Sequence, residues 1–353
     1  MSMRFEHENF PQRVVFASNE AARSVATEVR RLEAQRVMVI AGKPERELAD
    51  HIAADIPEAL RYEDIAMHVP IEVAERARVA AESHNIDAIV SVGGGSTTGL
   101  AKAIALTSGL PIVAVPTTYA GSEATNVWGL TQGAKKTTGA DMRVLPKSVV
   151  YDASLMISLP VPLSVASGLN ALAHCVDSMW APRSNPINRV FAAEGIRALN
   201  IGLPTVVADP RGVEGREFAL YGAYLSAVAF ASAGSGLHHK ICHVLGGKYD
   251  LPHAQTHAIV LPYVLALNAP AAVDDERRMA AAFVAESAVE GLERLRSRTD
   301  APRALRDYGF EREQIPSAAE AILLVVPESN PVSVSKQDIE RLLDAAWSGT
   351  EPQ

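Results

Sequence analysis

The sequence predicts an α/β domain built on a parallel sheet over residues 1–157, followed by an all-helical domain over residues 158–353. Three observations support this division. The chain has 353 residues, which suits two domains of ordinary size. Strand-like and helix-like patterns alternate in its first part. From about Pro162 onward the patterns are helical, so we place the boundary between Asp152 and Pro162.

In the first part, short apolar runs alternate with stretches of helical spacing. A short apolar run that ends at glycine or proline is typical of a strand buried on both faces of a parallel sheet. Alternation of such strands with helices indicates βαβ units. We expect Ser18 or Asn19 to cap the first helix. The expected strands are 36–40, 88–92 and 112–115, and the expected helices are 19–32, 71–83 and 98–107.

The second part shows helical spacing without a strong strand pattern. Short segments rich in proline, glycine and asparagine separate its helical stretches, as expected for connections between packed helices. The expected helices are 164–180, 188–199, 215–233, 276–296 and 336–347.

Composition and charge exclude several classes of protein. The formal net charge is -8, whereas a nucleic-acid-binding surface needs clustered positive charge. Two cysteines, Cys175 and Cys242, are too few for a disulfide framework and are expected to be buried thiols. Residues 1–12 lack a signal-like apolar stretch, and the longest apolar run, 258–267, is interrupted by Pro262. We therefore expect a cytoplasmic protein with no membrane partner.

A glycine-rich loop at 91–98 follows one expected strand and opens a helix. Glycines allow a phosphate to approach the backbone closely, and the free N–H groups at a helix start attract negative charge. A tight βα turn would have similar composition, and the loop is not the G-x-G-x-x-G fingerprint. The candidate cofactor-binding residues here are Gly93, Gly94, Gly95, Ser96 and Thr97.

A second polar loop, 116–123, follows the next expected strand. Ligands of open α/β sheets bind at the carboxyl ends of the strands, where hydroxyl groups and glycine suit a nucleotide. An ordinary polar loop remains the alternative. The candidate cofactor-binding residues in this loop are Thr117, Thr118, Tyr119 and Ser122.

Histidines are concentrated in the second part, where five of the ten fall within 238–257. His239 and His243 are four residues apart and share a helix face. His253 follows Gly246–Gly247, a turn that could return it to the same cavity. Single histidines are usually structural. We expect His238 and His257 to be structural or peripheral residues. The combination with another four-residue pair, Asn170 and His174, favours a functional site.

These motifs, in this order, resemble the iron-containing alcohol dehydrogenases from about residue 10 to Trp347. The resemblance implies a dehydroquinate synthase-like fold and a nicotinamide cofactor. In metal-using members, the positions of Asn170, His174, His239 and His253 bind Fe²⁺ or Zn²⁺. Asn170 stands where those members have aspartate, so the only anionic ligand is replaced by a neutral amide. Three histidines can still hold zinc, but we expect a vestigial site and no metal.

The departures from the superfamily pattern resemble its maleylacetate reductases. These departures are Gly99 in place of the usual aspartate, the short 116–123 loop, the 170–174 segment, Ser329–Pro331 and Ala345–Trp347. The resemblance implies reduction of the carbon–carbon double bond of maleylacetate to 3-oxoadipate, in bacterial breakdown of aromatic compounds. The alternatives are a metal-dependent alcohol dehydrogenase or carbonyl reductase of the same superfamily, a more distant glycerol dehydrogenase or dehydroquinate synthase, and a nucleotide-binding protein without catalytic activity.

That reaction assigns expected roles to the histidine segment. An enolate must be stabilised and protonated, and His243 and His253 are the candidate donors, without an assignment of which is the acid. Lys240 is the candidate contact for a carboxylate of the small dicarboxylate substrate, and a solvated helix position is its alternative. His239, His174 and Asn170 complete the candidate catalytic set. The resemblance also implies a homodimer.

Cofactor preference is expected from the segment after the 36–40 strand. NAD-preferring members of the family have an acidic residue there that binds the adenosine ribose. Here the segment reads Ala41, Gly42, Lys43, so we list Gly42 and Lys43 as cofactor-binding candidates. Without the carboxylate, a 2′-phosphate is not repelled. We therefore expect use of NADH with appreciable use of NADPH.

Overall fold

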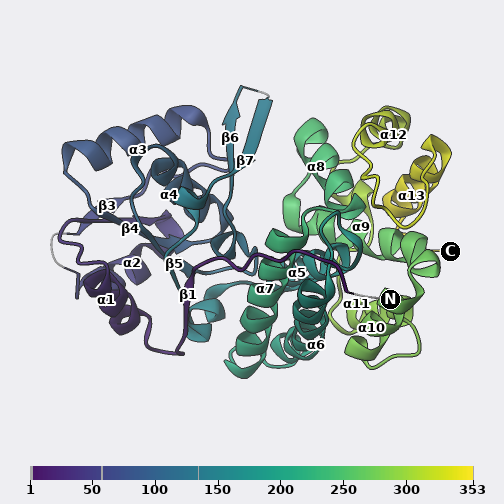
Figure 1. The fold of residues 1–353 in the computed structure, drawn as a ribbon, viewed down its shortest axis with the longest axis horizontal. Helices are drawn as coiled ribbons and strands as arrows, with labels where there is room; N and C mark the ends of the chain where they lie inside the picture. Colours follow the sequence, from purple (N-terminus) through teal and green to yellow (C-terminus); the bar gives the residue numbers. More distant parts are fainter. Residues whose placement is uncertain (1–2, 57–58, 134, 353) are drawn as a thin grey trace. The chain divides into compact units, whose positions relative to one another are not determined.

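The computed structural model describes residues 3–56, 59–133 and 135–352, which form two compact units (Figure 1). The α/β unit covers Phe10–Leu159, and the helical unit covers the residues from Pro160 together with the described N-terminal residues up to Asn9. The break between Leu159 and Pro160 lies within the expected interval, Asp152 to Pro162, and two residues after the expected division at 157/158, whereas the residues before Phe10 belong to the other unit than expected. The N-terminal segment joins the helical unit because the His7 ring packs near Phe191, with centroids 6.5 Å apart.

Six parallel strands and four helices build the α/β unit (Figure 1). In spatial order the strands are β1 (Arg13–Phe16), β8 (Ser148–Tyr151), β5 (Ile112–Pro116), β4 (Ala88–Gly93), β2 (Val37–Ala41) and β3 (Leu60–Tyr62). The helices are α1 (Ala21–Arg31), α2 (Arg46–Ala53), α3 (Ile71–Ser83) and α4 (Gly95–Ser108). An antiparallel hairpin, β6 (Val127–Gln132) and β7 (Lys135–Ala140), follows β5.

Burial on both faces of the sheet explains the apolar runs. Along β2, Val37 and Val39 pack with residues of α1 and α2 in one core, whereas Met38 and Ile40 pack with α3 and α4 in another. The three expected strands and the three expected helices are present. The strands β1, β3 and β8 and the β6–β7 hairpin were not expected. For β1 and β3 the reason is that they lie at the sheet edges and are only partly buried.

The expected cap of α1 is wrong. The helix begins at Ala21, and its capping position, Glu20, makes no side-chain hydrogen bond. Instead, the carboxylate of Asp152 accepts hydrogen bonds from the backbone N–H groups of Asn19, at 2.8 Å, and Ala21, at 3.0 Å. A carboxylate that folding brings to the helix start therefore replaces the local cap.

Nine helices of the described chain, together with short 3₁₀ turns, build the helical unit (Figure 1). They are α5 (Val161–Trp180), α6 (Pro186–Ala208), α7 (Glu214–Ala233), α8 (Leu237–Tyr249), α9 (His253–Asn268), α10 (Val273–Phe283), α11 (Ala288–Arg298), α12 (Ile315–Leu323) and α13 (Lys336–Ser348).

Two expectations for this unit are corrected. The expected helix 276–296 is two helices, because Val284 adopts a left-handed φ of 55° and α11 then packs closely on α10. At Gly291 a Cβ would lie 2.4 Å from the Cβ of Phe283, so only glycine fits there. Pro262 does not end its helix but lies inside α9, where its neighbour Leu261 is fully buried.

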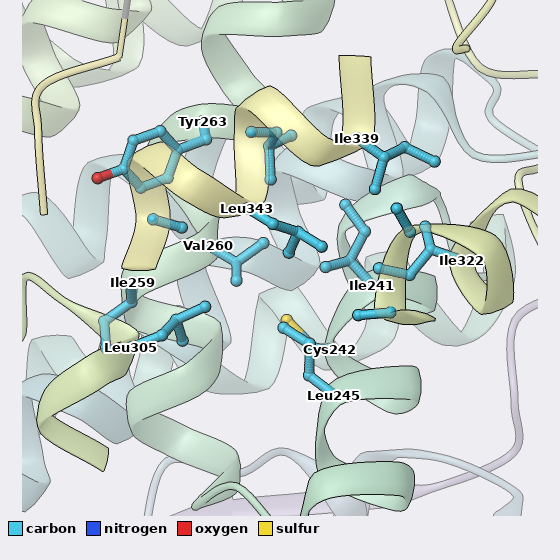
Figure 2. Packing of buried hydrophobic residues seen from close by; sticks show 14 of the residues in the cluster. Ile241, Cys242, Leu245, Ile259, Val260, Tyr263, Leu305, Ile322, Ile339 and Leu343 are labelled. Atoms are coloured by element: carbon cyan, nitrogen blue, oxygen red, sulfur yellow. The ribbon is translucent and has the colours of Figure 1, made fainter. Parts of the chain in front are cut away.

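The apolar face of α8 packs into a core with α9, α12 and α13 (Figure 2). Ile241 and Leu245 of α8 meet Val260 of α9 and Leu343 of α13 in this cluster. Cys242 belongs to the same cluster, and both it and Cys175 are buried free thiols, as expected. This core fixes the side of α8 that carries Ile241, and hence where its histidines lie.

By length and apolar composition, α6 is the one single helix of the described chain that could cross a bilayer; the bent pair α7 and α8 could do so if it is counted as one span. Half of the apolar stretch of α6 is buried, and the helix packs against α5 and α7. The core helices of globular proteins can be equally long and apolar.

Lys102 of α4 holds the segment after β5 in place. Its Nζ donates to the carbonyl oxygens of Ser122 at 2.6 Å, Thr125 at 2.8 Å and Val127 at 2.8 Å. Burial lowers the pKa of Lys102 to about 7, and the nearby Glu123 opposes this lowering. The hydrogen bonds offset the cost of burying the amine.

Replacing Lys102 should therefore destabilise the protein. Lys102→Met leaves three carbonyl oxygens without this donor, and we expect a loss of about 3 kcal/mol in the free energy of unfolding. The control is Lys147→Met, the same change at an exposed position, with an expected effect within about 0.5 kcal/mol. Urea denaturation followed by circular dichroism measures both. Equal losses in the two variants would refute the role of Lys102.

Candidate active site

The glycine loop has the geometry of a phosphate-binding turn. It runs from Gly93, the last residue of β4, into α4, which begins at Gly95. Gly93 has a φ of 152°, and a Cβ there would lie 2.4 Å from Oγ1 of Thr97, so a side chain is excluded. The open N–H groups at the start of α4 thus remain accessible to a ligand.

The second loop lies directly beside the first. Gly93 pairs with Pro116 in the sheet, and the Thr117 N–H donates to the Gly93 carbonyl oxygen at 3.2 Å. A Cβ at Gly94 would lie 3.0 Å from Cγ2 of Thr118. The two loops that the sequence singled out therefore form one surface at the carboxyl edge of the sheet, the position expected for a ligand.

Burial divides the candidate cofactor residues into two groups. The side chains of Thr97, Thr117 and Tyr119 are buried, and that of Tyr119 is fully so, which assigns them to the support of the loops. The residues with exposed or half-buried surface are Gly42, Lys43, Gly94, Gly95, Ser96, Thr118 and Ser122.

A hub of aromatic rings in the helical unit is centred on His239 of α8. The ring centroid of His239 lies 4.8 Å from that of His174 of α5, 4.8 Å from that of His257 of α9 and 6.1 Å from that of His243. Phe230 of α7 packs against it with centroids 4.4 Å apart. Helix α5 and the consecutive helices α8 and α9 thus bring the expected histidines together.

The histidines of this cluster differ in depth. His238 and His257 are completely buried and hydrogen-bonded to each other, His238 Nε2 to His257 Nδ1, at 2.9 Å. They are its innermost members. Of the two expectations for them, a peripheral position is therefore wrong, whereas a structural role agrees with their burial and mutual hydrogen bond. His243 and His253 are exposed and are the histidines that a substrate can reach.

The turn that returns His253 to the cluster is not the expected one. Gly246 and Gly247 lie inside α8, which continues to Tyr249. The chain reverses at Asp250, which has a left-handed φ of 54°, and α9 then begins at His253. The ring of His253 lies against that of His257, with centroids 4.3 Å apart.

Asp177 of α5 is a site residue that the sequence analysis missed. Its fully buried carboxylate accepts the Nδ1–H of His239 at 2.7 Å, and backbone N–H groups of Gly236 at 3.0 Å and His239 at 3.1 Å. It also accepts the His238 N–H at 3.3 Å. Asp177 therefore both caps α8 and orients His239. Its position three residues after His174 was the only local signal.

Burial keeps the inner histidines neutral. Burial, and to a lesser extent the neighbouring histidines, lower the pKa of His174 and of His238 to about 3. The pKa values of His239 and His257 are also well below the ordinary range for the same reasons. Neutral His239 carries its proton on Nδ1, facing Asp177, so its Nε2 is an acceptor. Burial raises the pKa of Asp177 to about 7, and three backbone N–H groups oppose this.

Several buried polar atoms of the expected site residues have no hydrogen bond. Among the described residues, Asn170 Oδ1, His174 Nδ1 and His239 Nε2 have no hydrogen-bond partner. Unmatched polar atoms are costly in an interior, so their concentration here indicates a place for a ligand or water. Lys240 is half-buried on α8, and its charge lowers the pKa of Asp177; its contact with a substrate carboxylate stays a prediction.

Comparison with known proteins now identifies the family. The family model for iron-containing alcohol dehydrogenases matches residues 11–153, and that for the C-terminal part of the family matches residues 164–347. The chain belongs to the iron-containing alcohol dehydrogenase family. The resemblance seen in the sequence is thereby confirmed, and the chain is a nicotinamide-nucleotide-dependent oxidoreductase.

Individual relatives extend over nearly the whole chain. Maleylacetate reductase of Pseudomonas sp. (strain P51) is 40% identical over 353 residues, covering 99% of this chain and 100% of that protein. A solved iron-containing alcohol dehydrogenase of Corynebacterium glutamicum is 58% identical, with a TM-score of 0.98 and coverage of 100% of this chain and 99% of that one. The solved maleylacetate reductase of Rhizobium sp. strain MTP-10005 is 41% identical, with a TM-score of 0.94 and coverage of 99% and 100%.

The residues at the family's metal positions fit Fe²⁺ poorly. Asn170 offers a neutral amide, and the rings of His174 and His239 are stacked, 14° from parallel, rather than converging edge-on. Within the described part of the chain, one group of three has ligand atoms close together, all within 4.8 Å: His238, His239 and His257. That group shares only His239 with the expected set, and it is fully buried without a carboxylate ligand.

Asp177→Asn should reduce turnover, because the amide keeps the shape of the carboxylate but cannot hold the His239 Nδ1–H with a charge. We expect kcat to fall roughly 10- to 100-fold with little change in KM, as for other groups that orient an active-site histidine. The matched control is Asp152→Asn, which removes a carboxylate that caps a helix of the α/β unit without contacting a histidine. Steady-state kinetics, normalised to the amount of folded protein, give kcat for both variants. Equal kcat values for Asp177→Asn and Asp152→Asn would contradict this role.

Proposed function

We propose that this protein reduces the carbon–carbon double bond of maleylacetate to 3-oxoadipate with NADH or NADPH, in bacterial degradation of aromatic compounds. The observation that carries the proposal is identity of about 40% to several maleylacetate reductases over essentially the full chain. The departure at Asn170, which distinguishes this chain from the expected metal-binding pattern, supports the same subgroup.

The reaction is a conjugate reduction. A bound nicotinamide nucleotide would supply a hydride to the alkene carbon β to the ketone, and the electron density of the double bond would move to the ketone oxygen as an enolate. The carbon between them then takes a proton, which completes the addition of one hydride and one proton. The protein must therefore hold the nucleotide, stabilise an oxyanion, deliver a proton and bind two carboxylates.

The histidine cluster supplies the donors for the second and third tasks. Burial keeps His174, His238, His239 and His257 neutral, so these rings are poor sources of positive charge. His243 and His253 are exposed on the same cluster. We assign the enolate contact and the proton to this exposed pair. Lys240, on the helix that carries His243, is the candidate partner of a substrate carboxylate.

We further propose that turnover does not require a metal ion. The family's anionic ligand is replaced by Asn170, and the nearest buried carboxylate, Asp177, already accepts His239 and three backbone N–H groups. A divalent cation placed there would meet only neutral ligands in a buried setting, which favours its loss to water. The expected cytoplasmic location and homodimer stay predictions.

One assay tests both the substrate and the metal. We expect maleylacetate to support NADH oxidation far better than simple aldehydes, before and after treatment with a chelator, and with less than about 0.1 metal ion per chain. Elemental analysis before the assay provides the metal content. A preference for aldehydes, with activity lost to chelator and restored by Fe²⁺ or Zn²⁺, would instead establish a metal-dependent carbonyl reductase.

Replacing either exposed histidine should slow the chemical step. His243→Ala and His253→Ala are each expected to lower kcat on the order of 10²–10³-fold, with a smaller effect on KM, because the donor acts mainly in the transition state. The control is His51→Ala, an exposed histidine of α2 in the other unit. Near-normal turnover by both folded variants would contradict the assignment, and a change in KM alone would reassign the histidines to carboxylate binding.

A further inference from the structure

No acidic residue stands directly at the carboxyl end of β2 in the sequence, but the carboxylate of Glu45 lies there in the structure. In dinucleotide-binding α/β folds, a carboxylate at this place accepts hydrogen bonds from the adenosine ribose hydroxyls. The segment Ala41–Lys43 provides none. The chain after β2 continues as a 3₁₀ turn, Lys43–Glu45, and this turn brings Glu45 back over the strand end.

The position of the Glu45 side chain is defined by its contact with Gly42. The Glu45 N–H donates to the Gly42 carbonyl oxygen at 3.1 Å, which closes the turn. Oε2 of Glu45 then lies 2.9 Å from the point where a Cβ at residue 42 would stand. The carboxylate of Glu45 therefore occupies the space that a side chain at position 42 would fill, and glycine at 42 leaves room for it.

This carboxylate lies at the same edge of the sheet as the glycine loop. Strand β2 pairs with β4, and Ala41 is in register with Val92, the residue before Gly93. Neighbouring strands are about 4.8 Å apart. A nucleotide whose phosphates meet the start of α4 would thus place its adenosine ribose at the end of β2 in the usual arrangement of such folds.

Two cations lie beside Glu45 in the sequence. Arg46, the next residue, is paired with Glu63, with Nη2 to Oε2 at 2.5 Å, which draws its guanidinium toward that carboxylate. Lys43 is exposed. Burial raises the pKa of the Glu45 carboxyl, whereas its own backbone N–H lowers it.

We propose that Glu45 is the residue that selects NADH over NADPH, by accepting the ribose 2′- and 3′-hydroxyls and repelling a 2′-phosphate. It takes the place of the acidic residue that position 42 lacks. The proposal replaces the sequence-based expectation of appreciable NADPH use. It rests on the proposed use of a nicotinamide nucleotide but not on the substrate.

Direct binding measurements test this inference without turnover. The full-length protein is titrated with NADH and with NADPH, and nucleotide fluorescence gives each Kd. We expect NADH to bind at least 30-fold more tightly than NADPH, and Glu45→Gln to lower this ratio by 10-fold or more, because a charged hydrogen-bond acceptor is lost together with the repulsion. The matched control is Glu47→Gln, an exposed glutamate of α2, which should leave the ratio within about 2-fold of the original.

A second variant tests whether a carboxylate in this space is sufficient, whichever residue carries it. In a Glu45→Ala background, Gly42→Asp returns a carboxylate to the same space from the local position and should restore most of the preference for NADH. The proposal would be overturned if Glu45→Gln left the ratio of the NADPH Kd to the NADH Kd unchanged. It would also be overturned if Glu45→Gln weakened the binding of both nucleotides equally. Since the measurement uses no substrate, failure of maleylacetate turnover would refute the proposed reaction and leave the Glu45 result standing.

Discussion

The buried carboxylate of Asp177 is the interaction on which the histidine site depends. It accepts the His239 imidazole and three backbone N–H groups at the start of α8, so one side chain of α5 fixes both the position of a helix and the orientation of its central histidine. The packing leaves no room for a side chain at Gly236, where a Cβ would lie 2.5 Å from Oδ1 of Asp177. The ring of His239 in turn contacts those of His174, Phe230, His238, His243 and His257.

The buried and the exposed histidines of this cluster suit different chemical roles. Burial holds the pKa of His174 and of His238 at about 3, which keeps these rings neutral and suited to hydrogen bonding and packing. His243 and His253 remain at the surface of the cluster, where a substrate can meet them. The proposal that turnover needs no metal ion rests on the same environment, because the position of Asn170 provides no anion and Asp177 already accepts His239 and three backbone N–H groups.

Contacts that form on folding overrule local sequence signals at three places in this chain. Ser18 and Asn19 are good capping residues in sequence, yet Asp152 caps α1. Ala41–Lys43 at the end of β2 includes no acid, yet Glu45 folds back over Gly42. The segment 276–296 has continuous helical spacing, yet Val284 turns left-handed and Gly291 lets two helices cross closely. In each case a contact made on folding outweighs a local preference of about 1 kcal/mol.

The sequence alone determined three of the four interior strands of the sheet, β2, β4 and β5, together with the glycine and threonine loops at their ends and the family. Strands buried on both faces must be continuous apolar runs, and a loop that approaches a phosphate must be glycine-rich, so both leave a local trace. Only the tertiary structure decided that His238 and His257 lie innermost, that Asp177 orients His239, and that Glu45 stands in for a side chain at position 42. Burial and long-range hydrogen bonds depend on which helices and turns meet in space, and residue spacing along one segment does not encode that.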